Sequence, residues 1–528
     1  MFKFKQKDYS GGQHGICQCG NCQTRFEERY GHALPVAEDH CDEKYQHWLA
    51  YARETINEVS NRIHVFVRAR RPDCAVLLKE ISDVTFREAN NAVDRPEPLW
   101  AHWAGELVQE VKGSRPDKPV CVNSVMFVDI PYRFTPEQSG LMALHLQQTA
   151  AHGGNPMAYM LGTPPEFKAA AFDVVRDFFT FHRDNRRYYT DVTPAAQVAL
   201  VSTQTREEFF GEASTSTHTQ RERRGTHIAL IRNHIPFDIV SPEFLEATGP
   251  EPLLDRFRAI VLPSGATLTP GQAATIDEYV RLGGGLVATG GGGAAPEAAE
   301  LPLASLGATT ILDRLSGSAV RAAYLRPDAE TDAVLETAKL VALDRAFTVV
   351  RPKESATVGL TLVPAARYGP PEKCHWDAES DHPGLLWFDH GEGRTAYLPW
   401  PVGELFHDLR MPEHSALLAH AVDGVGRGRQ VTTSAPEQVE MVVSGQPGAG
   451  RTLVHLINYS GHNGRTFGSP LDIHDITITL HGLTGVQRAT ALRAGRTLAV
   501  DVSGDDTAGA VSVTLPVLAG YELIALES

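Results

Sequence analysis

Short apolar runs alternate with helical patterns along about the first 190 of the 528 residues. Between residues 42 and 70 the apolar positions recur every three or four residues, which predicts one long amphipathic helix. Strands are predicted at residues 75–78, 84–86, 120–128 and 157–161, and further helices at 100–112, from 135 and at 165–183. Thr135 is the expected N-cap of its helix and Pro136 its first residue. Strands and helices that alternate in this way form parallel sheets with crossover helices.

The rest of the chain divides into two regions that differ in their pattern of predicted helices and strands. Residues 193–428 alternate again, with predicted strands at 197–201, 237–240, 259–263 and 285–289 and a helix near 222–234. Thr269 and Gln272 form a capping box that opens a further helix, so we expect an open doubly wound α/β domain. Residues 429–528 contain almost no helical pattern, and their short apolar runs predict an antiparallel β-sandwich. Three domains are therefore expected, at 1–192, 193–428 and 429–528.

Composition argues against several classes of function. With 49 Lys and Arg against 64 Asp and Glu, the net charge is -15, which argues against a nucleic-acid partner. No stretch approaches the roughly 20 apolar residues that span a bilayer. The segment from Met1 to Lys7 has no apolar core of a signal peptide. Seven cysteines, a low and odd number, fit a reducing compartment. We expect a cytoplasmic protein without a membrane or nucleic-acid partner.

Three cysteines within six residues form the sharpest motif of the chain. Cys17, Cys19 and Cys22 have a spacing that lets their thiolates converge on one tetrahedral Zn(II) ion. The fourth ligand is open among three candidates in this chain and a residue outside it; the three are His14, His40 and Cys41. The alternative is that the motif consists of three unrelated reduced thiols.

The cysteine segment also carries a resemblance to a known family. Residues Ile16–Cys22, followed by Phe26 and Arg29–Pro35, resemble the zinc-binding loop after strand four in family 42 β-galactosidases and related glycoside hydrolases. The resemblance implies that residues 1–192 are strands four to eight of a (β/α)8 TIM-type barrel. It also implies a class I amidotransferase-like trimerisation domain at 193–428 and, with Val454–Gly461, the C-terminal sandwich of these enzymes. From the resemblance we expect a glycoside or oligosaccharide substrate and β-galactosidase-like or fucosidase-like activity. We also expect a homo-oligomer, namely a trimer.

Glycoside hydrolysis needs two carboxylates that flank the scissile bond, about 5 Å apart for retention and farther apart for inversion. In a barrel both lie at the carboxyl ends of strands. The resemblance assigns the acid/base position to Asp8, where Asp replaces the family's Glu. It assigns the nucleophile's strand, the seventh, to Asp129 and the sixth to Glu88. We expect Asp8 and Asp129 to form the pair, with Glu88 able to replace either.

Neighbouring side chains are candidates for sugar contacts. Arg87 and Asn90 flank Glu88, and Arg133 follows Asp129; each can bind sugar hydroxyls or lower the pKa of a carboxyl group. Trp100 and Trp103 are candidates for a second kind of contact, because their rings can stack on sugar faces.

Strands one to three of the implied barrel have no counterpart in this sequence. A barrel without them has open edges and an uncovered apolar interior, so either the chain is an N-terminally truncated copy or another segment completes it. The half barrel and the Asp at position 8 favour a second hypothesis, a catalytically degenerate carbohydrate-binding or scaffold protein that retains the oligomerisation domain. An amidotransferase is disfavoured, because no Cys follows Leu262 or Thr289 and Cys374 lies in a predicted loop.

Overall fold

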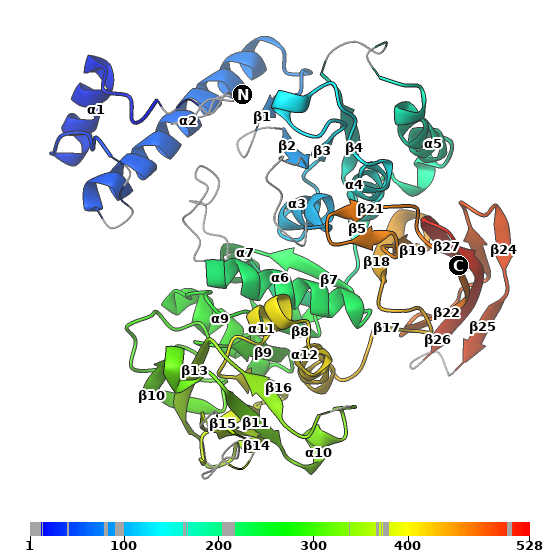
Figure 1. Cartoon of the computed structure of the whole chain (residues 1–528). Coiled ribbons are helices and arrows are strands. Elements are labelled where there is room, and N and C mark those ends of the chain that lie inside the picture. Colours follow the sequence, from blue (N-terminus) through cyan, green and yellow to red (C-terminus); the bar gives the residue numbers. More distant parts are fainter. Residues whose placement is uncertain are drawn as a thin grey trace.

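The chain is a mixed α/β protein with parallel sheets followed by antiparallel sheets in its C-terminal part (Figure 1). A computed structural model describes residues 12, 14–37, 39, 42–78, 83–89, 100–161, 165, 167–202, 217–336, 338–365, 369–370, 372, 380–503 and 509–528. Across these ranges, no helix combines the length and the apolar character that a membrane crossing requires.

Two helices open the described chain, α1 (Gly20–Tyr30) and α2 (Glu43–Arg70). The 28 residues of α2 confirm the long helix that the apolar period predicts. Asp42 caps it by accepting a hydrogen bond from the Lys44 backbone N–H at 2.9 Å. Buried side chains of α2, among them Tyr45 and Trp48, enclose Phe26 of α1 in a small apolar cluster. In Figure 1 this helix pair extends to the upper left of the molecule.

A four-stranded parallel sheet follows, in the order β1-β2-β3-β4. Its strands are β1 (Leu77–Leu78), β2 (Val84–Ala89), β3 (Val120–Val125) and β4 (Asn155–Tyr159). The crossover helices are α3 (Trp103–Lys112) and α4 (Ser139–Ala151), and α5 (Ala170–Asp184) follows β4. Ala89, Val120 and Val122 pack against α3 through its Ala104 and Val108. The predicted order of strands and helices is therefore present in this part.

The predicted helix start at Thr135 is wrong. Helix α4 begins at Ser139, and its N-cap, Gln138, makes no capping hydrogen bond with its side chain. The backbone around Pro136 instead pairs antiparallel with Phe127, because the Val128 N–H donates to the Thr135 oxygen at 3.0 Å. The chain thus folds back on the end of β3, which stops at Val125, before the helix can begin. A Thr-Pro pair fits such a loop as well as it fits a cap.

A nine-stranded mixed sheet forms the second part, in the order β12-β11-β14-β15-β16-β9-β8-β6-β7. Its parallel strands are β6 (Val198–Val201), β7 (Phe237–Val240), β8 (Ala259–Leu262), β9 (Gly285–Thr289) and β16 (Gly393–Leu398). Its antiparallel strands are β11 (Ala323–Pro327), β12 (Val341–Leu343), β14 (Thr357–Val363) and β15 (Pro383–His390); β10 (Ala308–Ser316) and β13 (Ala346–Pro352) pair separately. The predicted strands therefore form the parallel half, and the antiparallel half extends the same sheet.

Helices cover both faces of this sheet. They are α6 (Thr217–Arg232), α7 (Pro242–Thr248), α8 (Pro250–Arg256), α9 (Pro270–Arg281), α10 (Ala329–Asp332), α11 (Val402–Leu409) and α12 (Pro412–Val425). Neighbouring strand residues enter different cores, since Leu200 packs with α6 and α12 whereas Ala199 packs with α8 and α9. The capping box of Thr269 and Gln272 is confirmed at the start of α9.

Two antiparallel sheets form the C-terminal part. One contains β17 (Val431–Thr433), β22 (Ile473–His481), β25 (Val500–Ser503) and β26 (Ala510–Leu518). The other contains β5 (Thr193–Pro194), β18 (Val439–Gln446), β19 (Arg451–Asn458), β23 (Arg488–Ala491), β24 (Arg496–Leu498) and β27 (Tyr521–Glu527). A small hairpin joins β20 (His462–Asn463) to β21 (Thr466–Phe467). Ile478 and Val513 of the first sheet share a core with Met441 and Leu456 of the second, as predicted for a sandwich.

Buried polar contacts join the three parts. Gln109 of α3 donates from Nε2 to the backbone oxygen of Phe237 on β7 at 2.9 Å. Gln148 of α4 donates from Nε2 to the Tyr459 hydroxyl, which follows β19, at 2.9 Å. Arg223 of α6 forms an ion pair with Glu106 of α3, and both side chains are buried. Unpaired polar groups at these positions would be costly to bury, so the contacts fix how the parts meet.

Candidate functional site

Two predicted carboxylates lie at the carboxyl ends of neighbouring parallel strands. Glu88 is near the end of β2, and its backbone is in register with Asn123 of β3. The neighbours Ala89 and Val122 pack against α3, so strand alternation turns Glu88 and Asn123 to the opposite face of the sheet. Glu88 is half-buried, and within the described ranges no hydrogen bond or ion pair holds its carboxylate.

Asp129 follows the end of β3 by four residues, just before the short 3-10 helix η1 (Ile130–Tyr132). Its Oδ1 accepts a hydrogen bond from the Ile130 backbone N–H at 2.6 Å, so this carboxylate caps η1. Arg133 is at the other end of η1, exposed, with its guanidinium 4.9 Å from the centre of the Phe134 ring. The sheet therefore brings the backbone positions of Glu88 and Asp129 to one edge, as the sequence predicts.

The remaining predicted sugar contacts are distributed differently. Arg87 is buried on the face of β2 that α3 covers, so Arg87 and Glu88 do not share a face. Trp103 is beside the end of β2, since its indole Nε1 donates to the Glu88 backbone oxygen at 3.2 Å. Trp100 is 8% exposed, and its Nε1 donates to Glu106 at 2.5 Å. Asp8 and Asn90 lie outside the described residues.

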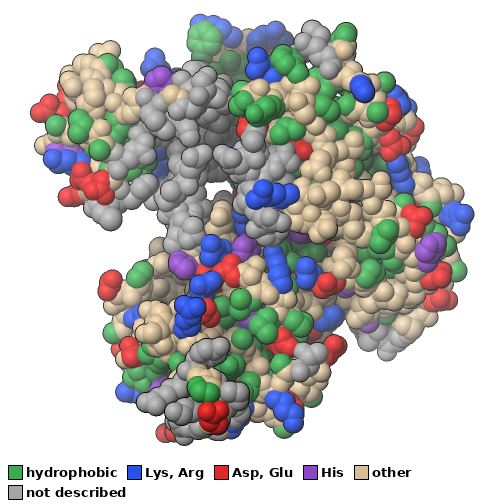
Figure 2. Space-filling model, in the orientation of Figure 1, with side chains coloured by type: hydrophobic (Ala, Val, Ile, Leu, Met, Phe, Trp, Pro, Cys, Tyr) green, Lys and Arg blue, Asp and Glu red, His purple; other side chains and the backbone are tan. Residues whose placement is uncertain are grey.

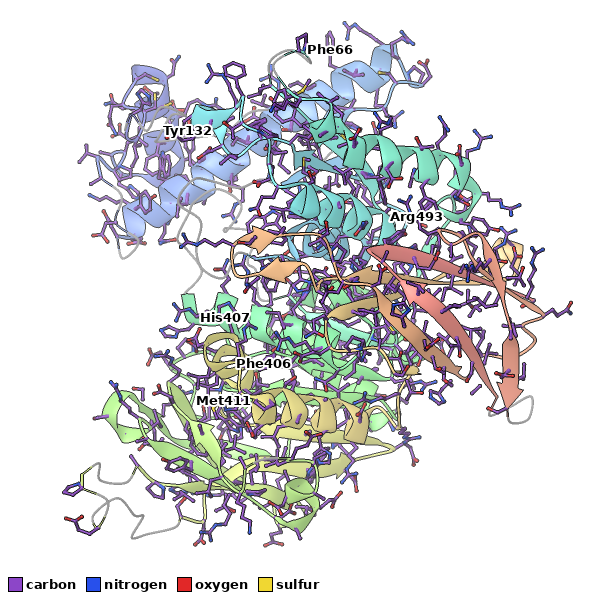
Figure 3. All side chains as sticks on the ribbon, turned by 45° about the vertical axis from the view of Figure 1, so that its right-hand side comes forward. Phe66, Tyr132, Phe406, His407, Met411 and Arg493 are labelled. Atoms are coloured by element: carbon purple, nitrogen blue, oxygen red, sulfur yellow. The ribbon has the colours of Figure 1, made fainter. Side chains whose placement is uncertain are left out.

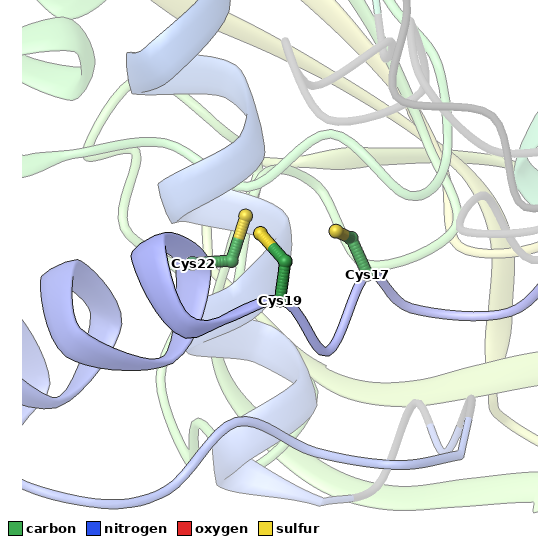
Figure 4. Close-up of side chains that lie close together, drawn as sticks. All are labelled: Cys17, Cys19 and Cys22. Carbon is green, nitrogen blue, oxygen red and sulfur yellow. The ribbon is translucent and has the colours of Figure 1, made fainter.

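The three cysteines of the N-terminal motif are close together in space. Their sulfur atoms all lie within 4.8 Å of one another, on the loop before α1 and on its first turn (Figure 4). Tetrahedral Zn–S bonds of about 2.3 Å hold two sulfur atoms about 3.8 Å apart, so a small contraction completes the geometry. Three soft thiolate donors are the chemistry that zinc prefers. The residues present therefore fit a zinc ion.

The surroundings make these thiols inequivalent. Cys19 is the N-cap of α1, and hydrogen bonds from the Cys22 backbone and from the neighbouring thiols lower its pKa. Burial and the adjacent thiols raise the pKa of Cys22 to about 12. Of the candidate fourth ligands, His14 is exposed in the same segment, whereas His40 and Cys41 lie outside the described residues.

A pocket that the sequence does not reveal lies where the three parts meet. Its volume is about 320 Å³, and its walls come from the turn before α3, from α6, from the end of α11, from the loop before β18 and from the β20–β21 hairpin. Of the predicted site residues that the structure describes, Trp100 alone lines it. Its charged side chains come from three separate segments of the chain: Arg224 and Arg232 on α6, Arg410 after α11, and Glu437 before β18. Only the packing of the three parts brings them together, so no spacing or motif could have indicated the pocket.

Comparison with known proteins identifies the fold. No family model matches the sequence, and no curated protein matches it. Solved structures do: α-L-fucosidase isoenzyme 2 from Paenibacillus thiaminolyticus has a TM-score of 0.74 and 15% identity, covering 97% of this chain and 75% of that chain. The β-galactosidase from Bacillus circulans sp. alkalophilus has a TM-score of 0.65 and 15% identity, covering 97% of this chain and 77% of that chain. Gan42B, a GH42 β-galactosidase from G. stearothermophilus, has a TM-score of 0.65 and 14% identity, covering 98% of this chain and 78% of that chain.

The chain thus has the fold of multidomain glycoside hydrolases over nearly its whole length. More particularly, it is structurally similar to GH42 β-galactosidases and to an α-L-fucosidase. This confirms the resemblance predicted from the cysteine segment at the level of the fold.

Proposed function

We propose that this protein is a glycoside hydrolase that cleaves O-glycosidic bonds of galactosides or fucosides with a pair of carboxylates. The observation that carries the proposal is the position of Glu88 and Asp129 at the carboxyl ends of neighbouring parallel strands. Catalytic groups of barrel hydrolases come from strand ends of this kind. The fold shared with β-galactosidases and a fucosidase supports the same class of substrate.

The proposed domain organisation follows the same relationship. Residues 1–192 are strands four to eight of a TIM-type barrel, 193–428 an amidotransferase-like domain for subunit contacts, and 429–528 a β-sandwich. The four parallel strands with crossover helices support the first assignment, and the helices on both faces of the nine-stranded sheet support the second. A homo-oligomer, a trimer, belongs to this proposal.

In the proposed mechanism one carboxyl group protonates the leaving oxygen, and a carboxylate attacks the sugar or activates water. Asp8 and Asp129 are the first choice of pair, and Glu88 is the carboxylate that can replace either. Glu88 suits this role, because it faces away from α3 and is held by no described partner. The Trp103 indole restrains the backbone at Glu88 through its hydrogen bond and so keeps the strand end in place.

The proposal includes a zinc ion that is bound by Cys17, Cys19 and Cys22 and has a structural role. The thiolates tie the loop before α1 to the first turn of that helix. Zinc analysis of the purified protein is expected to find about one ion per chain, and Cys19→Ser is expected to lower that content. An unchanged zinc content in Cys19→Ser contradicts the assignment.

A second candidate function is carbohydrate binding without catalysis. The register partner of Glu88 on β3 is the amide Asn123, not a carboxylate. Asp129, for its part, already accepts a hydrogen bond from its own η1 helix. Among the described strand residues, therefore, no second carboxylate is paired directly with Glu88, which favours a site that recognises sugars by hydrogen bonds.

Hydrolysis of aryl galactosides and aryl fucosides by the full chain tests the two candidates. For the enzyme, kcat/KM is expected to fall about 100-fold or more in Asp129→Asn or Glu88→Gln, because the proton or nucleophile is lost. The control Glu251→Gln alters an exposed carboxylate on α8 and should leave kcat/KM unchanged.

The outcomes separate clearly. Turnover that both carboxylate variants retain in full contradicts the proposed roles. Absence of turnover together with saturable galactose or fucose binding, weakened by Glu88→Gln, supports the binding protein. Neither turnover nor binding contradicts both functions.

A further inference from the structure

The pocket between the three parts differs in its chemistry from the sheet edge that carries Glu88 and Asp129. Its volume of about 320 Å³ is at the lower end of the range for small-molecule sites. Among the described residues, three arginines line it, Arg224, Arg232 and Arg410, against one carboxylate, Glu437. These arginines make the wall positive, although the whole chain carries a net charge of -15. Figure 2 shows Lys, Arg and His side chains gathered across the middle of the molecule, where its upper and lower halves meet.

Arg224 is the inner cation of the pocket. Its guanidinium is 4.8 Å from the centre of the Trp100 ring and 5.5 Å from that of Trp103, so two indoles hold it in place. Its Nε is buried and has no hydrogen-bond partner among the described residues. Burial lowers the pKa of Arg224 to about 10. The Arg224 side chain is thus held in place and largely removed from water, and its Nε–H makes no hydrogen bond to a described residue.

Arg410 faces the same space from the end of α11. It is the C-cap of that helix with φ of 55°, a left-handed conformation that costs energy for a residue other than glycine. Its Nη1 is buried and, within the described part of the chain, has no hydrogen-bond partner. Burial and the nearby Arg232 lower the pKa of Arg410 to about 10. A second cation therefore has an unused donor in the same pocket.

Among the described residues, neither Arg224 nor Arg410 forms an ion pair; Glu110 acts electrostatically on Arg224 but is 3.8 Å from Arg223. Asp408, which acts electrostatically on Arg410, forms ion pairs with Arg221 at 3.3 Å and Arg345 at 3.1 Å. Glu437 is 3.4 Å from Arg232, with half of its side chain exposed, and such a pair contributes little. Two guanidinium groups without an ion-pair partner are unfavourable to bury together, so an oxyanion bound between them is stabilised by their charge.

Three histidines, His102, His407 and His462, line the described wall, and two of them add no charge near pH 7. Burial lowers the pKa of His407, on α11, and of His462, on the β20–β21 hairpin. Their neutral rings offer hydrogen bonds on the two sides of the pocket. Figure 3 shows His407 on the side of α11 that faces the hairpin above it.

We propose that this pocket binds a small organic anion, a sugar-sized molecule whose phosphate, sulfate or carboxylate group is held between Arg224 and Arg410. Guanidinium groups bind such oxyanions through two parallel hydrogen bonds. Because the walls come from all three parts of the chain, the bound anion also bridges them. The site is independent of the carboxylates proposed for hydrolysis, so it holds whether or not the protein cleaves glycosides.

Calorimetric titration of the full chain tests the site, with inorganic phosphate, galactose 6-phosphate, galacturonate and neutral galactose as probes. Saturable binding of at least one anionic probe is expected, and galactose should not compete for it. The phosphate and carboxylate probes show which oxyanion the pocket prefers. Raising the salt concentration should weaken binding, because the attraction is partly electrostatic.

Variants separate the pocket from the general surface charge. Arg224→Gln and Arg410→Gln are each expected to weaken anion binding about tenfold or more, and Arg410→Lys less, since it keeps the charge. The control Arg281→Gln removes an exposed arginine of α9 that is paired with Glu278 and should not alter binding. Thermal unfolding shows whether each variant is folded.

Two results would overturn the proposal. One is that the folded wild-type protein binds none of the three anions at concentrations of about 10 mM, well above the weak end of specific affinities. The other is that Arg281→Gln weakens binding as much as the pocket variants do. Loss of hydrolysis in Glu88→Gln with anion binding intact would separate this site from the proposed function.

Discussion

At the scale of single residues, Glu222 shows how burial sets the charge of a side chain. It is a fully buried residue of α6, below the carboxyl ends of β8 and β9. Its Oε1 accepts from the Thr289 hydroxyl and its Oε2 from the Glu404 backbone N–H, both at 2.6 Å. Burial nevertheless raises the pKa of Glu222 from 4.5 to about 7, and the nearby Glu404 adds to the rise.

Glu222→Gln is expected to change how stability depends on pH. Because the pKa is raised in the folded state, the folded protein holds this proton more tightly than the unfolded chain does. The stability that this proton contributes is therefore fully present below pH 4.5, and this contribution is lost as the pH rises through about 7. Glutamine imitates the neutral acid and loses nothing over this range. At about pH 8 the variant should therefore be more stable than the wild type, with a free energy of unfolding that is higher by up to about 3 kcal/mol. Its unfolding temperature should be correspondingly higher.

Thermal unfolding at about pH 5 and pH 8 measures this difference. The matched control is Glu251→Gln, an exposed carboxylate on α8. If the wild type and Glu222→Gln lose stability in parallel between the two pH values, Glu222 does not titrate as proposed.

At the scale of elements, the contact between α6 and α11 depends on two glycines. A Cβ added at Gly225 would overlap the backbone oxygen of Gly403, and one added at Gly403 would overlap the backbone oxygen of Glu222. The helix backbones therefore touch directly. This close approach carries Arg224 on α6 and Arg410 at the end of α11 into one pocket.

Gly225→Ala is expected to destabilise the protein by about 2 kcal/mol or more, because two rigid backbones must move apart. In an ordinary helix the same change stabilises by up to about 1 kcal/mol, so the sign of the effect is diagnostic. Gly448→Ala is the control, since nothing lies within 4 Å of an added Cβ there. Denaturant unfolding that shows Gly225→Ala as stable as the control contradicts the close contact.

Elements are also the level at which the sequence was most informative. The long apolar period of α2 and the capping box of α9 depend on local rules, and both predictions are confirmed. Thr135 and Pro136 satisfied a local rule as well, but pairing with the strand end at Phe127 determined their conformation. Glu88 and Asp129 could be placed at strand ends from the sequence, whereas Arg224 and Arg410 could not be brought together, because only tertiary packing joins α6 to α11.

At the scale of the whole molecule, one buried carboxylate joins elements from different parts. Glu440 on β18 is 3.0 Å from Nε2 of His152 after α4 and 3.7 Å from Nδ1 of His102 before α3, and the Tyr459 hydroxyl donates to it. Burial alone would raise the pKa of Glu440, but the hydrogen bonds from His102 and His152 hold it well below its ordinary value. The sandwich is thereby attached to the N-terminal sheet by a charge that must stay partnered.

Glu440→Gln is expected to weaken this attachment at neutral pH by roughly 3 to 5 kcal/mol, the cost of breaking a buried charged pair. Since the pKa is lowered in the folded state, the carboxylate stabilises the protein above its ordinary pKa of 4.5, and that stability is lost as the pH falls below it. The difference between variant and wild type should therefore narrow in acid. The control Glu437→Gln, three residues away and half exposed, should cost about 1 kcal/mol or less. Thermal unfolding from about pH 7 to pH 3.5 follows both variants, and a Glu440→Gln deficit that stays constant over this range means that the charge of Glu440 does not hold the parts together.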